Sequence, residues 1–266
     1  MKKLKTFIFT LSALFVLACG YNVYDVYVAY ATEGTVADPV VHQQSATRTG
    51  LVGYWSMDSN DINGTTVYDK SGWKNNAVST GGPTVAAGKI NQAISLNSTT
   101  QYLDAGNSAS LNLTNNFSIS TWVKTNAIGA VQIIVAKSAG NYTESQYEVR
   151  LTATGVPELI ATNGTGVFSG TDNTPLIPNT WYHLVGVMDN KVMKVYINSR
   201  VGSAPATLTG TQSTTAEDVF IGKGGNLYGT GNYFNGLIDD VRIYNKALSA
   251  QEIQNIYSAA KIRHIQ

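Results

Sequence analysis

The chain has 266 residues, of which 13% are charged, and its formal net charge is +1. Lys and Arg do not cluster beyond the extreme N-terminus, which excludes the electrostatic footprint of a nucleic-acid-binding protein. The single cysteine, Cys19, excludes an intrachain disulfide. The 25 glycines and 15 tyrosines, with abundant Thr, Ser and Asn, indicate many strands joined by turns rather than a helical protein.

Residues 1–31 have the pattern of an export signal or a membrane anchor. A basic start, Met1–Lys5, precedes an apolar stretch over 7–18 that is too short to span a bilayer by itself. The pattern therefore places the rest of the chain outside the cytoplasm, in the extracellular space or the cell envelope. It also predicts that any contact with a membrane is made through this segment alone.

Three ways of processing this segment stay open. Val16–Cys19 resembles a lipobox, which would make Cys19 the lipidated residue of a lipoprotein. Ala29–Ala31 offers an A-x-A cleavage site for ordinary secretion. An uncleaved anchor could instead run on through Val23–Ala31, although Asn22 and Asp25 interrupt it.

Strand signals fill the chain after a linker at residues 32–49, which shows no sustained periodicity. They predict one domain over 50–260, followed by a tail at 261–266. The predicted strands are 51–57, 90–96, 102–105, 117–124, 131–136, 147–151, 157–161, 181–188, 192–198 and 219–222. Polar turn residues predict one hairpin at Asn97–Thr100 and another at Asp189–Lys191.

A final strand begins at Leu237, and its alternation assigns residues to two faces. One face would carry Leu237, Asp239, Val241 and Ile243, and the other Ile238, Asp240, Arg242 and Tyr244. Asp239 would then lie among three aliphatic side chains on the core side. Because an unpaired buried carboxylate is costly, Asp239 is expected to meet a metal, a cation or backbone donors.

A short C-terminal helix follows this strand. Ser249 and Glu252 fit a capping box, in which the serine side chain accepts from the Glu252 N–H and the glutamate reaches back. Ile253, Ile256 and Tyr257 then follow at helical spacing and predict one apolar stripe.

Five segments together resemble laminin-G-like modules of the concanavalin A-like superfamily. The segments are 50–58, 69–77, 117–124, 179–187 and 234–257. The resemblance implies an all-β fold, a two-sheet antiparallel jelly-roll sandwich with a short C-terminal helix. It is less informative about function, because one fold carries many activities.

The resemblance also raises the possibility of a glycoside hydrolase, since some families on this fold are glucanases. Their active strand places two carboxylates around a glycosidic bond. The nearest pattern here is Glu144 with Glu148, about 13 Å apart along a strand at ~3.3 Å per residue. Hydrolytic pairs are about 5–9.5 Å apart, so the sequence favours a protein that is not an enzyme.

A calcium ion is the cofactor that the sequence suggests. Modules of this resemblance often carry structural Ca²⁺ between the opening loop and the last strand. Asp58, Asp69, Asn75 and Asp239 supply the hard oxygen ligands that Ca²⁺ takes. The alternative is that Asp69 and Asn75 only cap their loop through Asx-turns.

Aromatic residues in loops are the candidates for ligand binding, because sugars stack on aromatic platforms. Trp73, Tyr142, Tyr228 and Tyr233 lie in such stretches, whereas Trp55, Trp122 and Trp181 fall in strand signals and favour packing. We therefore expect an exported, non-catalytic, lectin-like module that recognises glycans or a cell-surface protein. A glycoside hydrolase and a purely structural or adhesion domain are the alternatives.

Overall fold

The computed structural model describes residues 48–139, 144–225 and 232–263, with the side chains of 261–263 left out. The predicted export segment, Cys19, Tyr142 and Tyr228 lie outside the described residues. Within the described part, no helix is long and apolar enough to cross a membrane.

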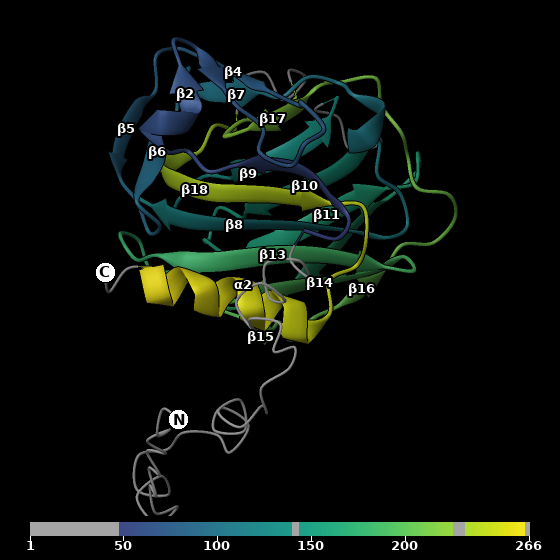
Figure 1. Ribbon diagram of the computed structural model, residues 1–266. Helices are drawn as coiled ribbons and strands as arrows, with labels where there is room; N and C mark the ends of the chain where they lie inside the picture. The colour runs from purple at the N-terminus through teal and green to yellow at the C-terminus, as the bar shows by residue number, and fades with distance from the viewer. Residues whose placement is uncertain (1–47, 140–143, 226–231, 264–266) are drawn as a thin grey trace, which may run out of the picture. The chain divides into compact units, whose positions relative to one another are not determined.

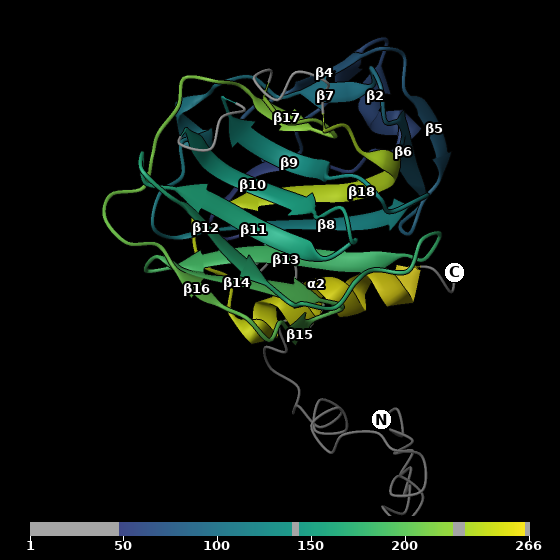
Figure 2. The same ribbon diagram turned by 180° about the vertical axis from the view of Figure 1, so that it is seen from behind.

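Two antiparallel sheets face each other and form a sandwich (Figures 1 and 2). Sheet A follows the order β15 (Arg200–Val201), β14 (Val192–Ile197), β13 (Tyr182–Asp189), β8 (Phe117–Thr125), β18 (Asn235–Tyr244), β6 (Gln92–Asn97) and β5 (Thr84–Ala87). Two further strands join it, β1 (Leu51–Trp55) beside β18 and β16 (Ala206–Thr207) beside β14.

Sheet B forms the second layer. Its order is β12 (Val167–Thr171), β11 (Pro157–Thr162), β10 (Ser145–Leu151), β9 (Gln132–Ser138), β17 (Val219–Ile221), β7 (Tyr102–Asp104), β4 (Ala77–Thr80), β3 (Thr66–Val67) and β2 (Ile62–Asn63). The described helices are two 3₁₀ turns, η4 (Ser59–Asp61) and η5 (Ala109–Leu111), and α2 (Ala250–Arg263). The two-sheet jelly roll with a C-terminal helix is confirmed.

One predicted hairpin is confirmed and the other is wrong. β13 and β14 pair up to Asp189 and Val192, so Asn190 and Lys191 form a two-residue turn, and both have positive φ. The segment Asn97–Thr100, in contrast, joins two different sheets. β6 pairs with β5 and β18, whereas β7 pairs with β4 and β17, so the connection crosses the sandwich.

The core between the sheets is apolar. Phe117, Ile119 and Val123 project into it from β8, as their alternation predicts, and the Tyr147 ring packs at 5.4 Å from the Phe117 ring. Trp55 is fully buried there, and its indole N–H donates to the Asn75 carbonyl at 2.9 Å. The interior therefore results from period-two alternation on two facing sheets.

The outer face of sheet A is covered by helix α2, which runs beside β13 (Figure 1). Ile253 and Ile256 pack there against Val185, Val187 and Tyr244. The capping box is confirmed. Ser249 Oγ accepts from the Glu252 N–H at 3.3 Å, and Glu252 Oε2 accepts from the Ser249 N–H at 2.9 Å.

The predicted faces of β18 are wrong for Ile238 and Asp239 and confirmed for Val241, Ile243 and Tyr244, because a bulge interrupts the strand. The register shifts between Asp239 and Arg242, and Asp240 has φ +52°. Ile238 lies in the core before the bulge, and Val241 and Ile243 lie there after it. Asp239 therefore points to the outer face, opposite Trp122, instead of sharing the core with the aliphatic residues.

Candidate functional site

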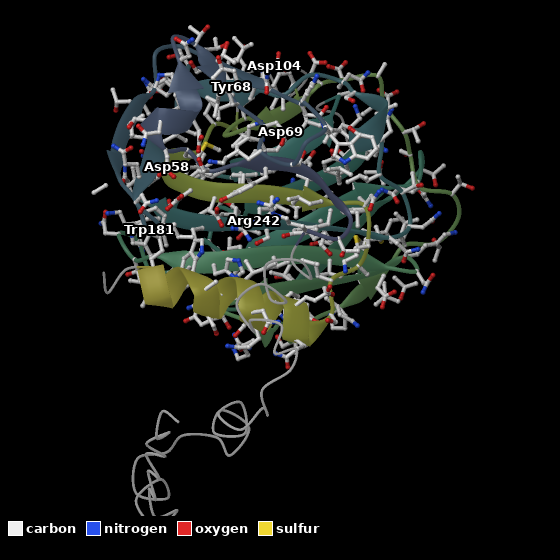
Figure 3. All side chains as sticks on the ribbon, in the orientation of Figure 1. Asp58, Tyr68, Asp69, Asp104, Trp181 and Arg242 are labelled. Atoms are coloured by element: carbon white, nitrogen blue, oxygen red, sulfur yellow. The ribbon has the colours of Figure 1, made fainter. Side chains whose placement is uncertain are left out.

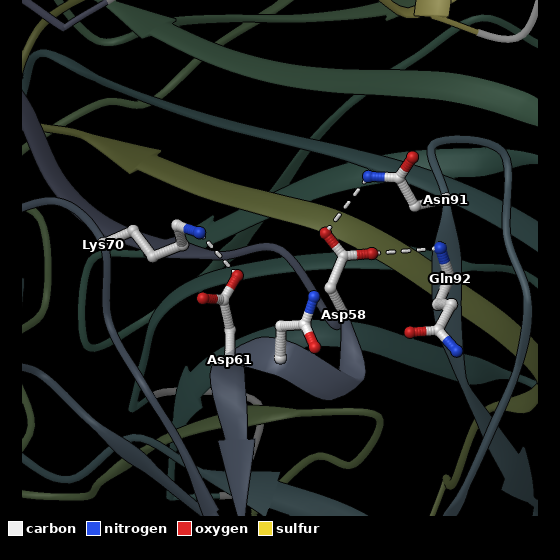
Figure 4. Close-up of a pocket in the computed structure, with 6 residues that line it drawn as sticks. Asp58, Asp61, Lys70, Asn91 and Gln92 are labelled. Carbon is white, nitrogen blue, oxygen red and sulfur yellow. Dashed lines mark hydrogen bonds and ion pairs between the residues drawn. The ribbon is translucent and has the colours of Figure 1, made fainter. Parts of the chain in front are cut away.

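An open, polar hollow of about 490 Å³ lies where the first turn of the domain meets the loop before β6 (Figure 4). All six residues that line it are polar. They are Asp58, Asn60, Asp61, Lys70, Asn91 and Gln92. The first three belong to or adjoin η4, Lys70 follows β3, and the last two come from the loop into β6.

Asp61 forms an ion pair on one side of the hollow. Its Oδ2 is 2.5 Å from Lys70 Nζ and accepts a hydrogen bond from Ser56 Oγ at 2.6 Å. Burial alone would raise the pKa of Asp61, but the hydrogen bonds from Lys70 and Ser56 outweigh it and lower this pKa. Asp61 is therefore an ionised acceptor at neutral pH.

Asp58 ties the first turn to the loop before β6. Its Oδ1 accepts from the Gln92 N–H at 3.0 Å, and its Oδ2 accepts from Asn91 Nδ2 at 3.4 Å (Figure 4). Gln92 Oε1 in turn accepts from the backbone N–H of Ser59 at 2.9 Å and from its hydroxyl at 2.7 Å. These reciprocal bonds fix the two walls of the hollow relative to each other.

Two exposed aromatic residues flank Lys70, a lining residue of the hollow, in the sequence. Tyr68 is 42% exposed, and its N–H donates to the Asp61 carbonyl at 2.9 Å. Trp73 is 56% exposed in the loop that follows Lys70. Carboxylates and amides that bind hydroxyl groups, together with exposed aromatic faces, suit a polyhydroxylated ligand.

The structure uses Asp69 and Asn75, two predicted calcium ligands, to cap a loop. The Asp69 carboxylate accepts from the N–H groups of Tyr54, Ser71 and Asn75 at 2.8–2.9 Å, and from Ser71 Oγ at 2.7 Å. The Asn75 amide nitrogen donates to the Val52 carbonyl at 2.7 Å. Four hydrogen bonds engage both Asp69 oxygens, so this carboxylate fits a cap better than a metal ligand.

The other two predicted ligands, Asp58 and Asp239, contact the loop before β6 instead. Figure 3 labels Asp58 and Asp69 at separate places. Across the described ranges, no group of three or more His, Cys, Asp or Glu side chains could hold a metal ion. The donor set thus does not fit one calcium ion joining the 69–75 loop to β18, and calcium binding by the chain stays a prediction.

The two predicted aromatic ligand residues within the described ranges, Trp73 and Tyr233, lie in different surroundings. Trp73 belongs to the loop after β3, close in sequence to the hollow, whereas Tyr233 packs on Tyr102 of β7 with ring centroids 6.2 Å apart. Lys223 Nζ lies 4.3 Å from the Tyr102 ring centroid. Tyr233 therefore belongs to a packed aromatic group on sheet B.

The acidic pair considered for hydrolysis has a different geometry from the expected one. Glu144 precedes β10, so it does not share a regular strand with Glu148. Glu148 is buried, accepts from Ser145 Oγ at 2.7 Å, and lies 3.7 Å from Arg150. Arg150 also pairs with Glu158 at 3.0 Å. The carboxylates of Glu148 and Glu158 thus share one guanidinium group.

Sequence reasoning found Asp58 but missed the other five residues that line the hollow. Three of these, Asn60, Asp61 and Lys70, lie in short turns that carry no periodic signal. Asn91 and Gln92 lie in the predicted strand 90–96, which in fact begins at Gln92. The available signal was the density of Asp and Asn around residues 58–63, which is typical of polar turns.

The fold and the hollow define the class of protein, a jelly-roll domain of the concanavalin A-like type. The family model described as the concanavalin A-like lectin/glucanases superfamily (Laminin_G_3) matches residues 97–254, and the chain belongs to this family. No curated protein matches the sequence.

Solved structures share the fold at low sequence identity. Domain 4 of AbnA, an extracellular GH43 arabinanase from Geobacillus stearothermophilus solved with arabinotriose, is 24% identical, with a TM-score of 0.62 over 78% of this chain and 98% of that domain. Botulinum neurotoxin type C, described as dependent on two ganglioside molecules for cell entry, is 13% identical, with a TM-score of 0.60 over 82% of this chain and 53% of the other.

A sialidase from Trypanosoma rangeli, a mutant that displays trans-sialidase activity, is 15% identical. Its TM-score is 0.58 over 80% of this chain and 33% of the sialidase chain. The chain therefore spans only part of the toxin and sialidase structures. At these identities the likeness establishes the fold.

Proposed function

We propose that this chain is an exported, non-catalytic, lectin-like module that binds glycans in the hollow between η4 and the loop before β6. The observation that carries the proposal is the lining. It contains two carboxylates, three amide side chains and one ammonium group, with no apolar residue. Such groups form paired hydrogen bonds with neighbouring sugar hydroxyls.

The related structures support a glycan as the ligand class. The AbnA domain was solved with arabinotriose, and the neurotoxin is described with gangliosides. The exposed Trp73 and Tyr68, close in sequence to Lys70 of the lining, offer aromatic faces for stacking on a sugar. The basic and apolar pattern of residues 1–18 supports export to the cell surface, where such ligands occur.

A glycan array with matched variants tests this function. The wild-type domain should bind a defined set of glycans, and Asp58→Asn and Asn60→Ala should each weaken binding by about tenfold, the loss of one good hydrogen bond. Val201→Ala is the control, because Val201 is exposed on β15, at the opposite end of the sheet order from β6.

Each other outcome points to a different function. Release of reducing sugar from soluble β-glucans by the wild type would show a hydrolase and contradict the non-catalytic assignment. Binding that survives both hollow variants would move the glycan site elsewhere on the domain. An array without any bound glycan would favour a structural or adhesion role and overturn the proposal.

A further inference from the structure

We propose that Asp239 is a positioning residue for the hollow, which fixes the Asn91–Gln92 wall by holding the loop Gly88–Gln92 from the outer face of sheet A. Its effect on ligand binding rests on the proposed function, whereas its effect on the loop does not. Asp239 does not line the hollow, and the contacts that connect it to the lining residues run through the loop.

The bulge in β18 delivers the Asp239 side chain to this loop. Along one edge of β18, β6 pairs with residues 235–238 and β1 with residues 241–244. The two bulged residues between them have no ladder partner on that edge. The loop before β6 fills this interval, and the side chain of Asp239 meets it there.

Two backbone donors converge on one oxygen of Asp239. The N–H groups of Lys89 and Ile90 both donate to Oδ2 at 2.8 Å. Asp239 is fully buried, so water does not compete for these bonds. These two bonds join residues 150 and 149 positions apart in the sequence, and they tie the loop to β18.

Glycine at position 88 makes this close approach possible. A Cβ atom there would lie 2.7 Å from Asp239 Oδ2 and 2.5 Å from the carbonyl carbon of Gln92. Both distances are far below van der Waals contact, and the second involves backbone. The Gly88 N–H also donates to the Asn91 carbonyl at 3.0 Å, which closes the turn.

The loop held in this way carries one wall of the hollow. Asn91 adopts φ +52° directly after Ile90, and Gln92 then donates its N–H to Asp58. Contacts therefore run without interruption from Asp239 through Lys89 and Ile90 to the residues that face the ligand. Ile90 is buried beside Trp122, so the middle of the loop has little freedom to compensate for a lost anchor.

Three variants separate the acceptor role of Asp239 from its bulk. Asp239→Asn keeps a carbonyl oxygen for the two N–H groups, Asp239→Leu removes the acceptor, and Gly88→Ala displaces the loop while leaving Asp239 in place. Val201→Ala is again the control. The first measurement is the backbone and side-chain amide NMR spectrum of each protein, recorded without ligand.

The loop signals decide the inference. The Gln92 N–H and the Asn91 side-chain amide should shift in Asp239→Leu and Gly88→Ala, and should stay close to wild type in Asp239→Asn. Should Asp239→Leu fail to fold, Asp239→Ala, which also removes the acceptor, decides it, because Gly88→Ala would displace the Gln92 backbone by its own steric contact. Unchanged Asn91 and Gln92 signals in a folded Asp239→Leu or Asp239→Ala would overturn the inference.

Calorimetric titration with the glycan found on the array then measures the consequence. Asp239→Asn should bind within about threefold of wild type, and the two displacing variants at least about tenfold more weakly. Equal affinity in all four proteins would overturn the positioning role in binding. If wild type binds no glycan, the proposed function fails, and the NMR comparison alone still confirms or refutes the loop anchor.

Discussion

The two faces of sheet A are built by different rules. The inner face packs apolar side chains against sheet B, and its residues follow strict alternation along β8 and β13. The outer face, beneath α2 and the loop before β6, buries polar groups that include Ser120, His183 and Asp239. The interior is thus indifferent to pH, whereas the outer face couples folding to protonation.

Unpaired polar atoms concentrate on the outer face. Five side chains there have a buried polar atom without a hydrogen-bond partner among the described residues, namely Trp122, His183, Asp239, Arg242 and Tyr244. Burial raises the pKa of Asp239 to about 8, with further contributions from the charges of Asp240 and Asp58. Burial, with the nearby charge of Arg242, lowers the pKa of His183 to about 3.

The largest effect is expected from breaking the inner face. Phe117 is fully buried, so Phe117→Ala should lower the free energy of unfolding by about 3–5 kcal/mol through lost burial and a cavity. Denaturant unfolding at pH 5 and at pH 8.5 should give the same loss, because no titratable group changes. Val201→Ala should stay within about 0.5 kcal/mol, and a strongly pH-dependent loss in Phe117→Ala would contradict this account of the interior.

Asp239→Asn should remove the pH dependence of stability that Asp239 gives to the outer face. The pKa of Asp239 is higher in the folded chain than in the unfolded chain, so the protonated form stabilises the fold, and this stability is lost as pH rises toward about 8. Wild type should lose up to about 1.4 kcal/mol per pH unit across that window relative to the variant. Denaturant midpoints from pH 5 to pH 9 measure it, and parallel curves would refute it.

His183→Gln should have the opposite signature at low pH. The pKa of His183 is lower in the folded chain, so its stability contribution is complete above pH ~6.5 and is lost as pH falls toward about 3. Subtracting the unfolding free energy of the variant from that of wild type cancels the acid sensitivity that the carboxylates give to both proteins. Wild type should lose more stability than the variant below pH 6, and an equal loss in both would count against a neutral buried histidine.

The helix that covers the outer face supplies a smaller effect. Ser249→Ala removes the acceptor for the Glu252 N–H and should cost about 1 kcal/mol in unfolding free energy. Ser249→Asp is the matched control, because it restores an acceptor at the N-cap. A helix that starts elsewhere in solution would show itself as equal denaturant midpoints in all three proteins.

The contrast between the faces also explains what the sequence could predict. Phe117, Ile119 and Val123 were assignable because a regular strand places alternate residues on one face. Asp239 was predicted on the wrong face because a bulge at Asp240 adds one residue to the strand. A period-two pattern gives no signal of such a bulge. Capping at Ser249 was predictable because its partner, Glu252, is local in sequence.

The hollow was largely beyond prediction for the same physical reason. Asp58 and Gln92 are 34 residues apart and meet only because η4 and the loop before β6 are brought together by the sheet topology. Lone polar residues in turns carry no period from which a shared location could be inferred. Asp58 was predicted only as a calcium ligand, from its place at the end of the first strand.

The smallest predicted effect is a gain in stability at the β13–β14 turn. Asn190 and Lys191 have φ +47° and +69°, the pattern of a type I′ turn, which prefers Asn-Gly. Lys191 bears the cost of a left-handed conformation, about 1–2 kcal/mol for an L-residue with a Cβ. Lys191→Gly relieves it but adds freedom to the unfolded chain, worth about 0.4–1 kcal/mol.

A side-chain contact reduces the gain further. Lys191 Nζ donates to the Gly210 carbonyl at 2.6 Å in an exposed position, and glycine loses this bond. Because exposed hydrogen bonds contribute about 0.5 kcal/mol at the low end, the net gain should be only a few tenths of a kcal/mol. Lys191→Asn tolerates the same φ but lacks the ammonium group, so its change in denaturant midpoint measures the contribution of the bond to Gly210. A clear loss of stability in Lys191→Gly, seen as a lower denaturant midpoint, would mean that the contact with Gly210 outweighs backbone strain in fixing this turn.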